Sequence, residues 1–355
     1  MQKKIIALAI ASALTAPALA FADATVYGQA NLSIDMVSDG MTNSTRTNQL
    51  NSNTSRLGLK GSEDLGSGLS AVWQMEGAIG MDTGTVGTSL FNRDTYLGLS
   101  SATAGTGLVG RHATPYYMAT RKLDMFADGI ADNRGSQVDG KVATTPFNDT
   151  LMGGGHDTRL SNVIAYISPN LSGFSIAAAT VFGGETANTA NPTKGTLLSL
   201  AGMFEQGPIY AALAYDNIKA GSAGSGDLGT GTFGAVDDKK TAFKVGGSFT
   251  TDAFAVNAVL ERITATTAAT GVDLKNTNFY LAGKFNLTST DDVKLAYTRR
   301  GDHTGVTDNA KEYTIGYDHS LSKATSVYAL YSKLTDNTLN APDPSVVSLG
   351  VKHSF

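Results

Sequence analysis

The sequence predicts an all-β protein: a 16-stranded antiparallel transmembrane β-barrel with one long inward-folded constriction loop. Segments of about ten residues alternate between apolar and polar side chains, the length and period of a strand that crosses a bilayer. Short and long connections alternate between these segments. After the N-terminal segment no run of about 18 apolar residues occurs, which excludes helical membrane spans. Forty glycines, 13 tyrosines and 14 phenylalanines, against eight prolines, also favour strands and turns over helices.

The first 22 residues have the organisation of a secretory signal peptide. Two lysines precede an apolar run from Ile5 to Leu19, and small residues in an A-x-A arrangement follow. We expect cleavage after Ala22, which leaves a barrel domain of residues 23–355. A transmembrane anchor is the alternative, but the polar, strand-like sequence that follows argues against it.

Composition limits the classes of protein that remain. The chain has 27 Lys and Arg, 31 Asp and Glu, and no cysteine. The expected signal peptide removes two lysines and no acid, so the mature chain is more acidic still. The acidic balance argues against a nucleic-acid partner, which would require a concentrated basic patch. An exported chain without disulfides must be stabilised by extensive backbone pairing or a large core.

Period-two alternation starts at the mature N-terminus and recurs to the last residue. In the segment 24–37, Val26, Leu32, Ile34 and Met36 share one face, and polar residues occupy the other. The same pattern occupies residues 278–287, 312–321 and 347–355. One apolar and one polar face is typical of a barrel strand between lipid and water.

The connections support the barrel over other all-β folds. Tight turns are expected at residues 64–68, 169–173, 206–208, 251–252 and 322–323, and longer polar loops at 38–53, 220–238, 264–275 and 336–344. Counting the segments between them gives sixteen strands, with short turns on one side and long loops on the other. A secreted β-sandwich or β-solenoid is the alternative, but it offers no reason for this rhythm.

One connection is far longer than the others. Residues 113–157 show little sustained alternation. Loops of this length in compact domains are usually functional or disordered, and a sixteen-stranded barrel has room for one inside. We interpret this segment as a constriction loop that folds inward after the fifth strand. A long extracellular loop is the alternative.

Several stretches resemble a known family, the Gram-negative general (trimeric) porins. The similarity is to the β-proteobacterial and neisserial type, with γ-proteobacterial relatives. The stretches occur in the family's order along the mature chain: Ser55–Glu76, Asn92–Leu99, Gly110–Pro115, Arg159–Phe174 and Gly350–Phe355. The long loop has no residue-level match. The resemblance implies an outer-membrane homotrimer in which each protomer encloses a water-filled pore for passive diffusion of small hydrophilic solutes and ions.

The resemblance also implies a pore constriction in which wall arginines face acidic groups. The matching wall positions are Arg56, Arg93, Arg111 and Arg159, with Glu76 as the matched acid. Alternation places Arg56 and Glu76 on the polar faces of their strands, whereas the orientation of Arg93 and Arg111 rests on the resemblance. The loop candidates are Asp124, Asp128, Asp132 and Asp139. For any single arginine, a solvated residue at a strand end is the alternative.

These charges predict the ion preference. Side chains that line a narrow passage act at short range and through a lower effective dielectric than distant loop charges. The wall arginines therefore predict a modest anion preference despite the negative net charge. Glu76 and one or more loop aspartates oppose it.

Other functions have less support. No G-x-S-x-G elbow, P-loop or H-E-x-x-H motif occurs, so we expect no enzymatic activity, no cofactor and no metal site. A solute-specific oligosaccharide or phosphate channel is the nearer alternative. However, the clearest lumen-side aromatics, Tyr27 and Tyr280, come from distant strands, and no concentrated lysine cluster is evident in the sequence. Adhesin or phage-receptor roles of the outer loops are compatible with transport.

The C-terminus predicts a further partner. Phe355 ends the last alternating strand. The resemblance implies that the barrel-assembly machinery recognises this terminal aromatic, and that outer-membrane lipid and lipopolysaccharide surround the barrel. The alternative is that Phe355 only packs at the membrane interface.

Overall fold

The computed structural model describes most of the barrel. It covers residues 24–40, 46–86, 89–134, 151–153, 155–181, 195–220, 238–305, 307, 309–337 and 343–355. The predicted signal peptide, Asp139 and the middle of the predicted constriction loop lie outside the described residues. No helix in the described part is long and apolar enough to cross a membrane.

The described elements are one short helix and a series of long strands. The helix is α2 (Pro115–Arg121). The strands are β1 (Thr25–Ser38), β2 (Arg46–Ser52), β3 (Arg56–Gly66), β4 (Leu69–Gly80), β5 (Thr85–Val86), β6 (Thr95–Ser101), β7 (Gly105–Ala113), β8 (Arg159–Ile167), β9 (Phe174–Val181), β10 (Thr196–Gln206), β11 (Ile209–Lys219), β12 (Lys239–Thr250), β13 (Phe254–Thr266), β14 (Asp273–Asn286), β15 (Asp291–Arg300), β16 (Ala310–Ser320), β17 (Thr325–Asp336) and β18 (Ser345–Ser354).

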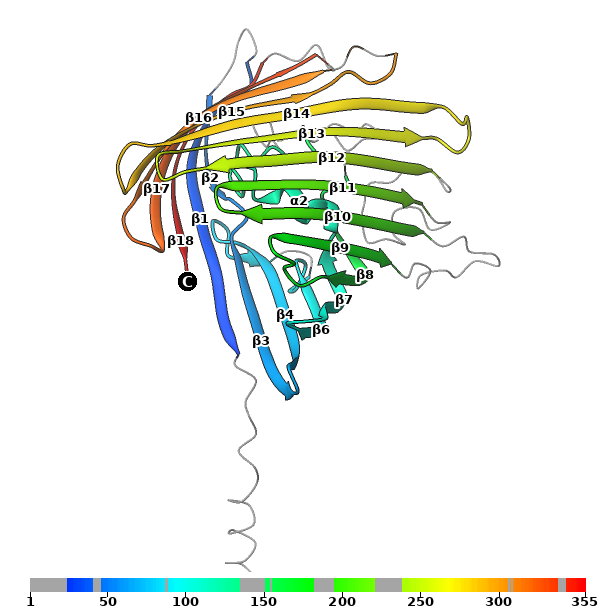
Figure 1. The fold of residues 1–355 in the computed structure, drawn as a ribbon. Coiled ribbons are helices and arrows are strands. Elements are labelled where there is room, and N and C mark those ends of the chain that lie inside the picture. The colour runs from blue at the N-terminus through cyan, green and yellow to red at the C-terminus, as the bar shows by residue number, and fades with distance from the viewer. Residues whose placement is uncertain are drawn as a thin grey trace, which may run out of the picture.

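The strands form one closed antiparallel sheet. Apart from β2 and β5, each strand pairs with the next along the chain, and β18 pairs back onto β1 (Figure 1). β2 and β3 both pair with β1 and together make one interrupted strand, while the two-residue β5 pairs with the end of β4. Within the described residues the barrel therefore has sixteen strands, which confirms the predicted fold class.

The interruption between β2 and β3 has a local cause. Thr54 has a φ of 52°, in the left-handed region that a strand does not use. Here Ser55 takes the place of a ladder partner, because its Oγ accepts from Asn31 N at 2.9 Å and donates to Asn31 O at 3.1 Å.

The prediction of a polar loop over residues 38–53 is wrong in its second half, because β2 occupies it. The loop predicted at 264–275 is likewise shortened by the ends of β13 and β14. In both places the alternation is weak, because Leu50 is the one large apolar residue of β2 and polar residues predominate at the ends of β13 and β14.

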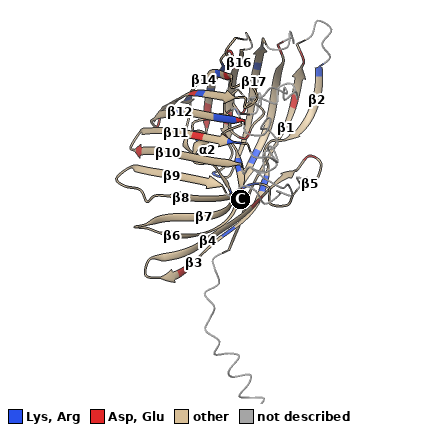
Figure 2. Ribbon diagram, turned by 90° about the vertical axis from the view of Figure 1, so that its right-hand side faces the viewer, with Lys and Arg blue, Asp and Glu red and all other residues tan. Residues whose placement is uncertain are grey.

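The two faces of the sheet have opposite chemistry. Apolar side chains such as Val26, Leu97 and Phe285 are exposed on the outer face, whereas Asn31 and Asp35 are buried on the inner face. In Figure 2 the ribbons of β6 to β9 carry almost no charge, and charged positions gather beside α2 and at strand ends. An apolar exterior and a polar interior suit a barrel with lipid outside and water inside.

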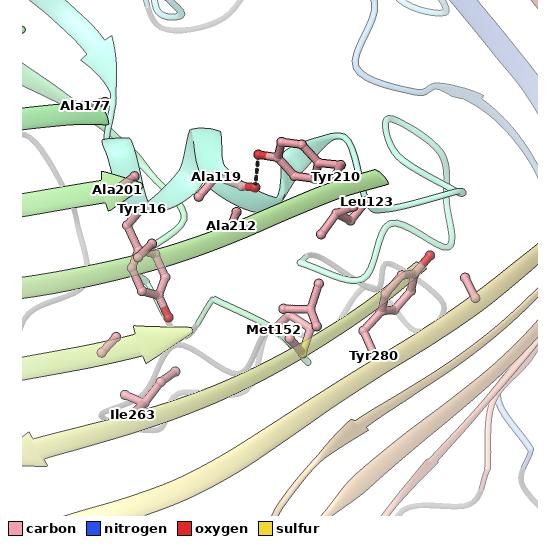
Figure 3. Close-up of a cluster of buried hydrophobic side chains, with 14 of the residues drawn as sticks. Tyr116, Ala119, Leu123, Met152, Ala177, Ala201, Tyr210, Ala212, Ile263 and Tyr280 are labelled. Atoms are coloured by element: carbon pink, nitrogen blue, oxygen red, sulfur yellow. Dashed lines mark hydrogen bonds between the residues drawn. The ribbon is translucent and has the colours of Figure 1, made fainter. Parts of the chain in front are cut away.

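The described part of the long loop lies against the inner face. Thr114 caps α2 by accepting a hydrogen bond from Tyr117 N at 3.1 Å, and proline occupies the first turn, where no backbone donor is needed. Tyr116 and Leu123 then pack with inner-wall residues of β10 to β14 (Figure 3). Tyr210 donates a hydrogen bond to Ala119 O at 2.7 Å.

A closed sheet predicts heat-modifiable migration. Each of the sixteen barrel strands in the described part of the chain is bonded on both sides, so dodecyl sulfate has no free edge from which to unravel the barrel. Unheated protein should keep its β-sheet circular dichroism and migrate away from the boiled form, whose mass is at most the 36.8 kDa of the full chain. Identical mobility before and after boiling, with loss of the β signal in both, would contradict a closed barrel.

Candidate functional site

A run of neighbouring strands carries the predicted wall residues. Arg56 lies on β3, Glu76 on β4, Arg111 on β7 and Arg159 on β8. Arg93 lies just before β6, in the connection from β4. These strands pair in sequence order, so the five side chains form one band on the inner wall.

Two of the wall arginines are neutralised by wall acids. Arg93 forms an ion pair with Glu76, whose other carboxylate oxygen accepts from Tyr27 Oη at 2.8 Å. Arg159 Nε lies 3.0 Å from Asp94 Oδ2. Asp94 is held in place because its Oδ1 accepts from Ala113 N at 2.8 Å.

Arg111 is different. Its Nε donates to Asn92 O at 2.8 Å and its Nη1 donates to Ser161 Oγ at 3.1 Å. No carboxylate of the described residues lies within ion-pair distance of it. A carbonyl and a hydroxyl fix the orientation of the guanidinium without cancelling its charge, so Arg111 leaves one positive charge uncompensated on the wall.

The loop segment 121–134 faces this band of wall residues. Its charged side chains surround another arginine, Arg121. Its guanidinium lies 3.0 Å from Asp132 Oδ2 and 3.8 Å from Asp124 Oδ2, and it also pairs with Asp128. Arg134 Nη2 lies 2.7 Å from the same Asp132 oxygen. The predicted loop acids therefore surround an arginine of their own loop.

Asp128 joins the loop to the wall. Its Oδ2 lies 3.0 Å from Arg56 Nη1, and its other oxygen pairs with Arg121. Burial alone would raise the pKa of this carboxyl, but the two guanidinium groups outweigh it and lower the pKa. Asp128 therefore stays ionised and holds the loop segment to β3.

Asp124 has a bracing role inside the loop. It is buried and accepts hydrogen bonds from Phe126 N at 2.9 Å and Asn133 N at 3.2 Å. Burial, and then the negative charge of Asp132, raise its pKa well above the usual range. Its contribution to the negative charge of the site is correspondingly reduced.

Eight of the nine site residues predicted from the sequence lie in this region, Asp139 lies outside the described residues, and the structure adds three more. Arg121, Arg134 and Asp94 were missed. Arg121 precedes Asp124 by three residues, a helical spacing that favours ion pairs, and Asp94 directly follows Arg93. Arg134 and Arg159 also both lie over the Tyr117 ring, 4.8 Å and 5.1 Å from its centre.

Buried polar contacts hold the two ends of the loop to the opposite wall. Glu261 on β13 accepts from Tyr116 Oη at 2.6 Å and from Gly153 N at 2.8 Å. Lys244 on β12 pairs with Asp157. His156 Nδ1 lies 3.3 Å from Asp216 Oδ2.

His156 shows that the contact between the end of the loop and the wall excludes water. Its side chain is fully buried, and burial together with the cation of Lys240 lowers its pKa to about 3. The imidazole is therefore neutral near pH 7 and acts as a hydrogen-bonding brace.

Comparison with known proteins identifies the family. Residues 7–339 match the family model described as Gram-negative porin. The chain belongs to the Gram-negative porin family. The outer membrane porin protein 32 of Delftia acidovorans is 28% identical to this porin over 378 residues, and the match covers the whole of both chains.

Solved structures support the same architecture. The anion-selective porin from Comamonas acidovorans superposes with a TM-score of 0.76 at 23% identity, covering 94% of this porin and 100% of that chain. OmpT of Vibrio cholerae, in its trimer form, superposes with a TM-score of 0.66 at 15% identity, covering 94% and 99%. Membership of the Gram-negative porin family makes this chain an outer-membrane channel for small solutes rather than an enzyme, as the sequence predicted.

Loop anchoring by Glu261 generates a prediction. Replacing Glu261 with alanine leaves the Tyr116 hydroxyl and the Gly153 amide buried without an acceptor, which costs about 1–3 kcal/mol for each group. We expect a lower thermal midpoint by circular dichroism in detergent and noisier open-channel current. Glu63→Ala, at an exposed position of β3, is the control. Equal noise and equal midpoints for the two variants would show that Glu261 does not restrain the loop.

Proposed function

We propose that this porin is a general diffusion channel with a modest anion preference, set where the band from β3 to β8 faces the loop segment 121–134. The proposal rests on Arg111, the arginine of this site that has no acidic partner among the described residues. The arginines of the site are Arg56, Arg93, Arg111, Arg121, Arg134 and Arg159; the acids are Glu76, Asp94, Asp124, Asp128 and Asp132. Among the described residues of the site, six arginines therefore exceed five acids by one positive charge even if every carboxyl is ionised.

The position of that charge matters more than the net charge of the chain. A narrow, partly dehydrated passage has a lower effective dielectric than bulk water, so a fixed charge at its wall acts strongly on a passing ion. Charges on the outer loops are screened beyond roughly 8 Å at physiological ionic strength. The porin from Comamonas acidovorans, which has the same fold and is anion-selective, supports the same sign.

Assembly and surroundings complete the proposal. We infer a homotrimer, supported by the trimeric OmpT structure with the same fold. Residues 1–22 would direct export. The outer face of the barrel would contact outer-membrane lipid and lipopolysaccharide, and the barrel-assembly machinery would recognise Phe355.

A sugar-specific channel has less support. Stacking of sugar rings requires aromatic faces open to the passage. Tyr116 and Tyr280 are buried instead, and their hydroxyls bond to Glu261 and to the loop backbone at Met125.

The ion preference is tested by removing Arg111. Arg111→Ser deletes a cation without releasing an acid, so the ratio of anion to cation permeability should fall by about two- to fivefold, the effect of roughly 0.5–1 kcal/mol at the passage. Arg111→Lys should keep most of the preference. The measurement is the reversal potential across a planar bilayer under a potassium chloride gradient.

Lys275→Ser is the matched control, because this lysine lies at the start of β14 and pairs with Asp273 at 3.1 Å. A reversal potential for Arg111→Ser that equals the control would place Arg111 outside the ion path.

Recognition of the C-terminus is tested by changing the Phe355 side chain alone. The backbone of Phe355 closes the barrel, donating to Gly28 O at 3.1 Å and accepting from Gly28 N at 2.9 Å, so deleting the residue would confound assembly with folding. We expect Phe355→Ala to lower the folded protein in the outer membrane severalfold more than Phe285→Ala, an equally exposed outer-face phenylalanine. Equal yields by semi-native gel of membrane fractions would leave interfacial packing as the role of Phe355.

A further inference from the structure

A second basic site lies away from the arginine band, on the side of the loop that faces the short turns. It is a cavity of about 520 Å³ lined by Lys122, Glu205, Tyr210, Asn257, Lys284 and Lys294, among others. Gly207 and Pro208 of one short turn line it, as do Thr250 and Ala255, which flank another. In outer-membrane barrels the short turns face the periplasm, so this cavity is the inner vestibule of the pore.

Two of its lysines occupy an unfavourable position. Lys284 on β14 and Lys294 on β15 are directly opposite each other in the antiparallel register. Like charges at directly opposed positions destabilise a sheet. Lys294 is compensated, because its Nζ lies 2.8 Å from Asp318 Oδ2 and 3.8 Å from Asp292 Oδ1. Lys284 has no carboxylate within ion-pair distance in the described part of the chain.

A third ammonium reaches the same cavity from the loop. Lys122, at the C-terminal end of α2, lies 3.6 Å from the centre of the Tyr210 ring and pairs with Glu205. The side chains of Lys122 and Glu205 are 44% and 64% exposed. Such solvated pairs contribute about 0–1 kcal/mol, so a bound anion could compete with Glu205 for Lys122.

We propose that this vestibule binds phosphate, free or as a phosphate monoester, between Lys284, Lys294 and Lys122. A phosphate group carries about two negative charges near neutral pH and has several strong acceptor oxygens. Each ammonium offers three hydrogen-bond donors. Lys284 faces another lysine in the strand register and so supplies a positive charge without an acidic partner among the described residues. The cavity has room for the organic part of a small phosphate ester. The site rests on the proposed channel function, and it adds a binding step to anion passage.

The lysine cluster was not evident in the sequence because its members are far apart along the chain. Lys122 and Lys284 are brought together only when α2 lies inside the barrel and the strands close around it. A phosphate-binding vestibule therefore depends on the loop position as well as on the strand register.

The test is phosphate inhibition of chloride current in planar bilayers at pH 8. For wild type, inorganic phosphate and glucose 6-phosphate should each reduce the current saturably, whereas glucose should not. Lys284→Gln should raise the half-inhibiting concentration about tenfold, as expected for loss of one charge-assisted contact. Lys275→Gln is the control and should match wild type.

Because the chain has no cysteine, Lys284→Cys gives a single modifiable site. An aminoethyl thiol reagent, which restores an ammonium, should recover phosphate inhibition; a hydroxyethyl reagent of similar size should not. Recovery with both reagents would assign the effect to packing and overturn the proposal.

The proposal is also overturned if wild-type inhibition does not saturate, if glucose inhibits equally, or if Lys284→Gln behaves as wild type. These outcomes leave the arginine band unaffected, because that claim stands or falls with the reversal potential of Arg111→Ser.

Discussion

Closure of the sheet is the constraint on which the rest of this porin depends. Lipid offers no hydrogen-bond partners, so a β structure in the membrane cannot leave an edge strand unpaired. The chain meets this requirement by pairing β18 with β1 and by reciprocal backbone bonds between Phe355 and Gly28. Once the ring is closed, every second side chain must point inward. The inner face must therefore be polar, and its charges need partners or water.

The long loop supplies many of those partners. At one wall its ends are held by buried contacts to Glu261, Lys244 and Asp216. At the other wall Asp128 joins Arg56 to Arg121, so the loop brings its own arginine to neutralise its own acids. In the described part of the loop, Arg121 and Arg134 pair with the loop acids, and Arg56 is the one wall arginine that pairs with a loop acid. Among the described residues Arg111 has no acidic partner, and the proposed anion preference follows from the positive charge that it leaves on the inner wall.

Most of the fold could be predicted from the sequence, because period-two alternation shows directly which side chains face lipid. The prediction failed where this alternation ends. β2 has one large apolar residue, Leu50, among polar ones and resembles a loop in sequence, although it continues the sheet. The matched arginines could be found by resemblance, but Arg121 and Arg134 lie in a loop with no such match. The facing lysines Lys284 and Lys294 required the strand register, which composition does not contain.

The central claim is that anions pass beside the uncompensated guanidinium of Arg111. Anomalous diffraction from crystals soaked in bromide tests it most directly, with Arg111→Ser crystals soaked in the same way. The account predicts a bromide peak in the passage within contact of Arg111 in the wild type, and loss of that peak in the variant. Bromide confined to other positions, or a peak that persists when Arg111 is replaced, would contradict it.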